Sequence, residues 1–143
     1  MKILVINGPN LNLLGEREPD KYGNNTYAQL CERIKKFCSE QNIEVEIYQS
    51  NIEGEIVTAI QDARNDFDGI VINPAGYTHT SVAVRDALLA VKIPAVEIHI
   101  SNIQEREDFR KISLTAPACI GQIAGFGQNS YLLGIQALKD YLS

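Results

Sequence analysis

Residues 2–10, KILVINGPN, are the stretch on which the interpretation of the fold depends. The apolar run Lys2–Asn7 ends in a glycine–proline pair, which is typical of a short strand buried on both faces. Strand patterns recur at residues 43–49, 69–73, 94–100 and 118–125. Helical patterns separate them at residues 26–40, 50–67, 81–91, 102–111 and 129–142, the fourth being short and polar.

Local signals indicate where two of these helices begin. Thr26 is followed three residues later by Gln29, and Ser50 by Glu53, and both pairs have the spacing of a capping box. The segment at residues 43–49 alternates apolar with polar side chains, so one face of that strand is expected to be wetter and to lie near a sheet edge.

Five successive strand–helix units predict an α/β fold: a doubly wound, five-stranded parallel sheet between two helical layers. Right-handed crossovers leave few topologies, and strand order 2-1-3-4-5, the flavodoxin-like order, is the expectation. With 143 residues the chain suits a single catalytic domain, residues 1–143. The long irregular segment of the first connection, about residues 15–25, is expected to be a lid or binding loop.

Composition excludes several classes of partner. Thirteen basic and eighteen acidic residues give a net charge of −5, and no stretch concentrates the basic ones. We therefore expect neither nucleic-acid binding nor a polybasic membrane anchor. No apolar segment is long enough to span a bilayer, and the N-terminus does not have the pattern of a signal peptide. Three cysteines at unhelpful spacings favour a reducing, cytoplasmic location.

Cofactor motifs are not found. Gly125-Phe126-Gly127 follows the last strand and lacks the third glycine of a dinucleotide fingerprint. The sequence has no GxxxxGK[ST] loop, no histidine–cysteine spacing for a metal and no Gly-x-Ser-x-Gly elbow. We expect acid–base chemistry by side chains, without a cofactor or metal.

Polar residues gather where the predicted strands end. Asn10 follows the first strand, Asn73 ends the third, and His99 and Ser101 end the fourth, so all should meet at one edge of the sheet. Glu97 alternates with apolar neighbours and shares a strand face with His99 and Ser101. Because an unpaired buried carboxylate is costly, this departure from an apolar strand indicates a site, with Glu97 orienting His99.

Each of these residues also has an ordinary structural interpretation. His99 could be a satisfied core histidine, and Asn10 and Asn73 could be loop caps. His79 could begin a helix, and Asp86 could be a solvated helix residue. Two loop residues, Arg17 and Tyr22, could lie on the surface without a role. Arg110 could pair on the exterior with Glu107 or Asp108, which contributes little.

Four blocks of sequence resemble the type II 3-dehydroquinate dehydratase family. The first runs from Asn7 to Gly15 and continues with Arg17-Glu18-Pro19 and Tyr22-Gly23. The others are NPAGYTHTS at 73–81 with RDAL at 85–88, EIHISN at 97–102 with Arg106-Glu107 and Phe109-Arg110, and GQI at 121–123 with GFG at 125–127. The resemblance covers essentially the whole chain, in order and at family spacing.

The resemblance implies a flavodoxin-like, cofactor-independent lyase of the shikimate pathway, which converts 3-dehydroquinate into 3-dehydroshikimate through an enolate. It implies that Tyr22, beside Arg17, is the general base and His99 the general acid, and that Asn10 stabilises the enolate. Substrate would be bound by Asn73, His79, Asp86, Arg110 and the backbone of Ile100 and Ser101. It also implies a dodecamer, a tetramer of trimers, in which Asp86 reaches a neighbouring subunit's site.

The residues suit this chemistry. An unperturbed tyrosine pKa near 10 leaves little phenolate at neutral pH, and a guanidinium within about 4–6 Å lowers that pKa.

Other function classes stay open on the fold alone: a non-catalytic flavodoxin-like module that binds FMN or an effector, a phosphoacceptor receiver domain, or a structural assembly protein. A receiver needs acidic residues where this chain has Asn7, Asn10 and Asn73, and an assembly role leaves Glu97, His99 and Ser101 unexplained.

Overall fold

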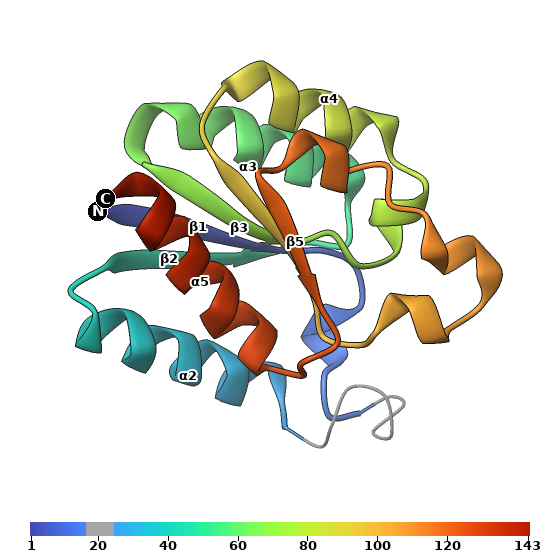
Figure 1. Ribbon diagram of the computed structural model, residues 1–143, viewed down its shortest axis with the longest axis horizontal. Helices are drawn as coiled ribbons and strands as arrows, with labels where there is room; N and C mark the ends of the chain where they lie inside the picture. Colours follow the sequence, from blue (N-terminus) through green and yellow to red (C-terminus); the bar gives the residue numbers. More distant parts are fainter. Residues whose placement is uncertain (17–24) are drawn as a thin grey trace.

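The computed structural model describes residues 1–16 and 25–143, which form a three-layer α/β structure (Figure 1). The strands are β1 (Lys2–Asn7), β2 (Glu44–Gln49), β3 (Gly69–Asn73), β4 (Ala95–His99) and β5 (Gly121–Ala124). The helices are α2 (Tyr27–Glu40), α3 (Glu53–Asp66), α4 (Val82–Val91) and α5 (Asn129–Leu142). Short 3₁₀ helices lie at Leu11–Leu13, Ala75–His79, Ile103–Glu105, Asp108–Lys111 and Ala116–Ala118.

All pairings in the sheet are parallel, and the strand order is β2-β1-β3-β4-β5, which confirms the predicted topology. The position of β2 at the edge agrees with the alternating pattern of its sequence. Helices α3 and α4 cover one face of the sheet, while α2 and α5 cover the other (Figure 1).

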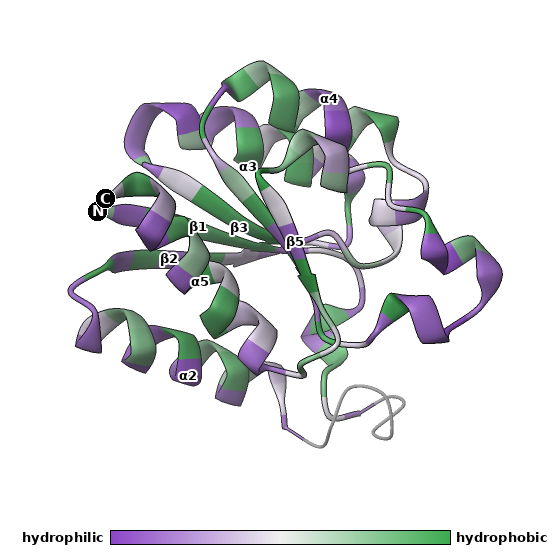
Figure 2. Ribbon diagram, viewed as in Figure 1, coloured by the Kyte–Doolittle hydropathy of each residue, from purple (hydrophilic) through white to green (hydrophobic). Residues whose placement is uncertain are grey.

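The side chains of β1 show how the sequence divides the core between two layers. Ile3 and Val5 point to the face covered by α2 and α5, whereas Leu4 and Ile6 point to the face covered by α3 and α4. This is the period of two that a strand imposes, here with apolar side chains on both faces. Figure 2 shows the central strands as mostly hydrophobic.

Of the two predicted helix starts, the one at Thr26 is confirmed and the one at Ser50 is wrong. Thr26 forms the expected capping box, since its side chain accepts from Gln29 N at 3.2 Å and Gln29 Oε1 accepts from Thr26 N at 2.9 Å. The capping box expected at Ser50 and Glu53 is wrong, because the cap of α3 is Ile52. Ser50 instead accepts from Ile52 N at 2.9 Å and donates to the Glu55 carboxylate at 2.6 Å, which stabilises the turn before the helix.

Several predicted boundaries also shift. Residues 102–111 contain two short 3₁₀ helices, Ile103–Glu105 and Asp108–Lys111, rather than the one short helix expected. Strand β4 spans Ala95–His99 rather than residues 94–100. Strand β5 begins only at Gly121, since Ala116–Ala118, which contains a proline, forms a 3₁₀ turn instead of strand.

Gly8 brings the ends of β1 and β3 close together. Its backbone N–H donates to Asn73 O at 2.8 Å, and a Cβ atom at this position would lie 2.4 Å from the carbonyl oxygen of Pro74. A larger residue would have to displace backbone, so glycine is required by the close approach. The two asparagines that end these strands, Asn7 and Asn73, are paired in the sheet register.

Candidate active site

A small polar pocket of about 110 Å³ lies beyond the carboxyl ends of β1, β3 and β4. Its lining contains these predicted site residues: Asn10, Asn73, His79, His99, Ile100, Ser101 and Arg110. The structure thus brings together the strand-end residues that the parallel topology predicts to converge. The remaining lining comes from Pro9, Leu11, Ala75, Gly76, Ile103 and Arg106.

Two described residues of the predicted site, Glu97 and Asp86, are not part of this lining. Glu97 is completely buried and lies behind His99. Asp86 is exposed on α4 and does not line the pocket. The expected positions of Arg17 and Tyr22, and most of the proposed lid at about residues 15–25, lie outside the described residues.

His99 and Glu97 form a buried pair at the end of β4. Nε2 of His99 lies 2.9 Å from the Oε2 oxygen of Glu97, and the histidine is only 5% exposed. The two residues are two positions apart on one strand, so their side chains leave the same face of the sheet. The contact fixes the ring through Nε2 and leaves Nδ1 as the nitrogen that can serve a ligand in the pocket.

Four neutral side chains surround the carboxylate of Glu97, and we call them the Glu97 cage. Oε2 accepts hydrogen bonds from Thr78 Oγ1 at 3.1 Å, Ser113 Oγ at 2.9 Å and Gln122 Nε2 at 2.7 Å. Oε1 accepts from Thr115 Oγ1. All of these groups can donate to a carboxylate, so the cage favours the ionised form of Glu97.

His99 and the cage together determine the direction in which the pKa of Glu97 moves. Burial by itself would raise this pKa, but the hydrogen bonds from His99, Thr115 and Gln122 lower it below the ordinary value of 4.5. Glu97 therefore carries a negative charge at neutral pH although it is buried. That charge offsets the positive charge of His99 whenever the imidazole is protonated.

His79 and Arg110 both line the pocket, and both contact the ring of Phe109. Nδ1 of His79 lies 2.8 Å from Ile112 O, and its ring meets that of Phe109 edge-on at a centroid distance of 6.1 Å. Burial lowers the pKa of His79, which favours the neutral imidazole. The guanidinium of Arg110 lies over Phe109 at 4.9 Å and donates from Nε to Glu107 at 2.6 Å.

The pairing of Arg110 with Glu107 and its place in the pocket lining are both observed, so the two interpretations of this residue are compatible. Glu107 is exposed, and the ion pair holds its pKa below the usual range. An exposed pair of this kind contributes little to stability. The guanidinium has further N–H groups, which remain suitable for an anionic ligand.

The two asparagines of the pocket are held differently. Asn10 adopts a left-handed backbone conformation with φ of 71°, and its N–H donates to Asn51 Oδ1 at 2.9 Å. Asparagine tolerates this conformation better than most residues. The Oδ1 oxygen of Asn73 accepts from Ala75 N at 3.1 Å, which closes the turn after β3.

Comparison with known proteins identifies the family. A model of the family described as dehydroquinase class II matches residues 1–139. The chain belongs to the class II dehydroquinase family. It is 60% identical to the 3-dehydroquinate dehydratase of Clostridium acetobutylicum, covering 100% of this chain and 99% of that one. It is 57% identical to the enzyme of the same name from Fusobacterium nucleatum, covering 99% and 98% of the two chains.

A solved structure gives the same answer for the fold. The crystal structure of the type II dehydroquinase from Butyrivibrio crossotus superposes with a TM-score of 0.96 at 56% sequence identity, covering 97% of each chain. The flavodoxin-like order expected from the sequence is therefore that of type II dehydroquinases. Membership of the dehydroquinase family also favours an enzyme over the FMN-binding, receiver and assembly interpretations.

Several residues of the candidate site were not predicted from the sequence. Arg106 lines the pocket, although its sequence context indicates only that it belongs to a motif. Ser113 and Thr115 of the Glu97 cage follow no periodic pattern. They lie in the irregular segment between β4 and β5, and only the folded chain brings them to the carboxylate.

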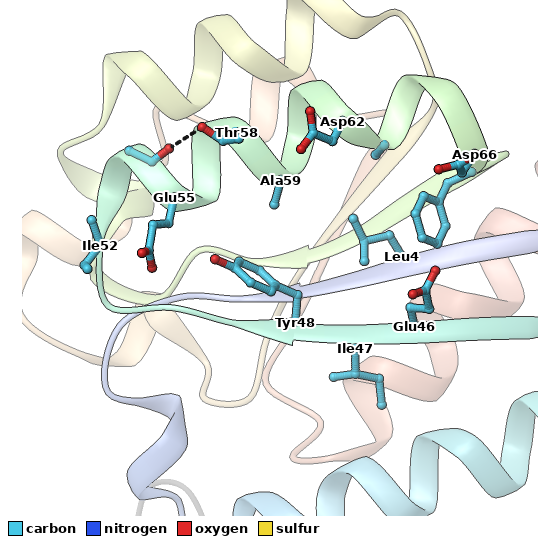
Figure 3. Close-up of a pocket in the computed structure, with 13 residues that line it drawn as sticks. Leu4, Glu46, Ile47, Tyr48, Ile52, Glu55, Thr58, Ala59, Asp62 and Asp66 are labelled. Atoms are coloured by element: carbon cyan, nitrogen blue, oxygen red, sulfur yellow. Dashed lines mark hydrogen bonds between the residues drawn. The ribbon is translucent and has the colours of Figure 1, made fainter.

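A larger cavity of about 670 Å³ lies elsewhere, between β2 and α3 (Figure 3). Leu4, Tyr48 and Ala59 are among its lining residues, as are the carboxylates of Asp62 and Asp66. None of the predicted site residues that the structure describes lines it. Cavity volume is therefore not the basis for choosing the candidate site, which is the smaller strand-end pocket lined by His99, a residue that can transfer a proton.

Among residues 1–16 and 25–143, no helix combines the length and the hydropathy needed to cross a bilayer.

The cage yields a prediction for stability. Thr115→Val should lower the free energy of unfolding at pH 7 by about 1.5–3 kcal/mol, because it removes a buried donor to a charged acceptor. The folded-state pKa of Glu97 is depressed, so the stability it contributes is present above pH 4.5 and is lost as the pH falls through the lower folded-state value. The difference between wild type and variant should therefore shrink in acid, as measured by urea unfolding across a pH series.

Thr58→Val is the matched control for this measurement. Thr58 is exposed on α3 and donates to Gly54 O at 3.0 Å, away from any buried charge. Its replacement should change stability by no more than about 0.5 kcal/mol at every pH. A Thr115→Val penalty that stays constant from neutral pH into acid would contradict the assignment of the cage.

Proposed function

We propose that this chain dehydrates 3-dehydroquinate to 3-dehydroshikimate through an enolate, with Tyr22 as general base and His99 as general acid. Its family places it among the lyases of the shikimate pathway. The observation that carries the catalytic assignment is the buried Glu97–His99 pair facing a polar pocket at the strand ends. The whole chain, residues 1–143, would act as one catalytic domain.

The first step is removal of a proton next to the ketone. Tyr22, as phenolate, takes this proton, and the electron pair of the broken C–H bond moves onto the carbonyl oxygen. Arg17 beside it favours the phenolate by its fixed positive charge. Asn10 stabilises the developing enolate directly or through a water, which lowers the barrier where negative charge appears. The position of Asn10 in the pocket lining supports this role.

The second step is loss of the hydroxyl. The enolate electrons return to form the carbon–carbon double bond as the C–O bond breaks, and His99 donates the proton that lets the hydroxyl leave as water. Glu97 accepts from Nε2 of the ring, so Nδ1 is the atom that we assign as the donor. The two proton transfers balance, and no cofactor takes part in either.

The polar residues that line the pocket bind the substrate. Asn73 and His79 bind hydroxyl groups, and the backbone N–H groups of Ile100 and Ser101 bind the carboxylate together with Arg110. Arg106 lies in the same lining and adds a second guanidinium. The local positive charge explains how a chain of net charge −5 can accept an anion.

Asp86 is proposed to act in the site of a neighbouring subunit rather than in that of its own chain. It is exposed on α4 and does not line the pocket of its own chain, which supports a role across a subunit interface. We assign it to the site of a neighbouring copy in a dodecamer built from trimers. This arrangement predicts that the particle measured by light scattering has the mass of twelve chains, and a fully active monomer would contradict it.

The activity is tested by mixing the purified protein with 3-dehydroquinate. The product is a conjugated enone, so ultraviolet absorbance should rise with time in proportion to the protein added. Heat-denatured protein is the control. If substrate is unchanged at high protein concentration, the proposed function is wrong.

A further inference from the structure

Tyr131 of α5 is fully buried, and its hydroxyl lies between the two asparagines that end β1 and β3. The hydroxyl accepts from Nδ2 of Asn73 at 3.0 Å and donates to Oδ1 of Asn7 at 2.5 Å. Both asparagines are themselves buried, and only Asn73 lines the pocket. Helix α5, which covers one face of the sheet, is thus hydrogen-bonded to the ends of the two strands beside the candidate site.

The hydrogen-bonded line continues away from the pocket. Nδ2 of Asn7 donates to the hydroxyl of Tyr27 at 3.3 Å, at the first residue of α2. Burial raises the pKa of Tyr131, so its hydroxyl stays protonated and remains a donor to Asn7. With the proton of Tyr131 directed at Asn7, the oxygen can only accept from Asn73.

This arrangement leaves the carboxamide of Asn73 a single orientation. Its oxygen is bound by Ala75 N, and one of its two Nδ2 hydrogens is bound by Tyr131. A flipped amide would set its NH₂ group against the N–H of Ala75 and lose both bonds. The second Nδ2 hydrogen remains for a ligand, at a side chain that borders the pocket.

Packing alone does not account for the hydroxyl of Tyr131. A phenylalanine has nearly the same shape, and burying a hydroxyl is unfavourable unless it is hydrogen-bonded. The oxygen contacts two asparagines, one of which we place in the substrate site. Its position is therefore better explained by the orientation of Asn73 than by the core around the ring.

We propose that Tyr131 is a positioning residue for substrate binding, which holds the Asn73 carboxamide so that it donates a hydrogen bond to a substrate hydroxyl. This inference rests on the proposed function, because Asn73 is assigned there to the substrate. Tyr131 acts only through Asn73 and does not touch the substrate. Its replacement should therefore weaken binding without altering the proton transfers.

The test is steady-state kinetics of Tyr131→Phe. We expect KM to rise about three- to tenfold, the value of one hydrogen bond, while kcat stays within about twofold. Tyr141→Phe is the matched control, since Tyr141 lies on the same helix but is 61% exposed. Its kinetic constants should equal those of the wild type.

A double-mutant cycle separates positioning from a general structural effect. In an Asn73→Ala background, Tyr131→Phe should raise KM no further, because the group that it orients is gone. If Tyr131→Phe raises KM equally in both backgrounds, or lowers the melting temperature without changing KM, the proposal is overturned. An inactive wild type would instead overturn the proposed function.

Asn7→Ala provides a second variant that leaves the pocket lining intact. Without its acceptor, the Tyr131 hydroxyl can turn its proton toward Asn73, so KM should rise in the same direction as in Tyr131→Phe. Circular dichroism establishes that each variant is folded before kinetics are measured. Wild-type KM values in both folded variants would overturn the assignment of Tyr131.

Discussion

Tyr22→Phe is expected to lower kcat about 10²–10⁴-fold, the usual contribution of a general base, while substrate still binds. The substitution removes a single oxygen and keeps the ring, so only proton abstraction should be lost. Both constants are measured by the rise in enone absorbance, and binding is measured by calorimetry with 3-dehydroquinate. Because the enolate no longer forms, exchange of the substrate's α-proton in D₂O should fall by the same factor as kcat.

Tyr48→Phe is a suitable control, since Tyr48 lines the cavity between β2 and α3 rather than the strand-end pocket. It should leave kcat and KM unchanged. Arg17→Leu tests the partner of the base: without the guanidinium the phenol is a weaker acid, so the rising limb of the pH–rate profile should move to higher pH. Near-normal turnover by Tyr22→Phe would contradict the assignment of the base.

His99→Ala should also lower kcat about 10²–10⁴-fold, but by blocking the other step. The enolate would still form and collapse back, while the hydroxyl could not leave without its proton donor. We therefore expect His99→Ala to retain α-proton exchange in D₂O at a rate far above its rate of enone formation. Nuclear magnetic resonance of recovered substrate measures the exchange, and absorbance measures the product.

The second histidine provides the contrast. His79 lines the pocket and is held by Ile112 O, so His79→Ala should raise KM and affect kcat much less. If α-proton exchange falls as far in His99→Ala as in Tyr22→Phe, then proton abstraction and loss of the hydroxyl cannot be assigned to separate residues. The stepwise roles proposed for Tyr22 and His99 would then be wrong.

Much of the site was predictable because parallel strands impose simple rules. Asn73 and His99 end neighbouring strands, and all strands of a parallel sheet end at the same edge. Glu97 and His99 are two residues apart, so the pleat puts them on one face without any knowledge of the rest of the chain. The prediction that Ser50 caps a helix was wrong for an equally local reason. Its hydroxyl forms hydrogen bonds with Ile52 N and the Glu55 carboxylate in a turn, and the capping pattern does not distinguish such a turn from a helix cap.

The sequence by itself determined the alternation of strands and helices and the edge at which polar side chains meet, because these follow from periodicities of two and 3.6 residues and from the parallel arrangement of the strands. The right-handed crossover reduced the strand order to a few topologies, of which 2-1-3-4-5 was the expected one. Only the tertiary structure decided what surrounds the reactive groups. Thr115 reaches Glu97 across 18 residues of sequence, and Tyr131 reaches Asn7 across 124. Such contacts have no period, since they depend on how helices and irregular segments pack against the sheet, and a buried charge or amide is held by whichever donors that packing brings within reach.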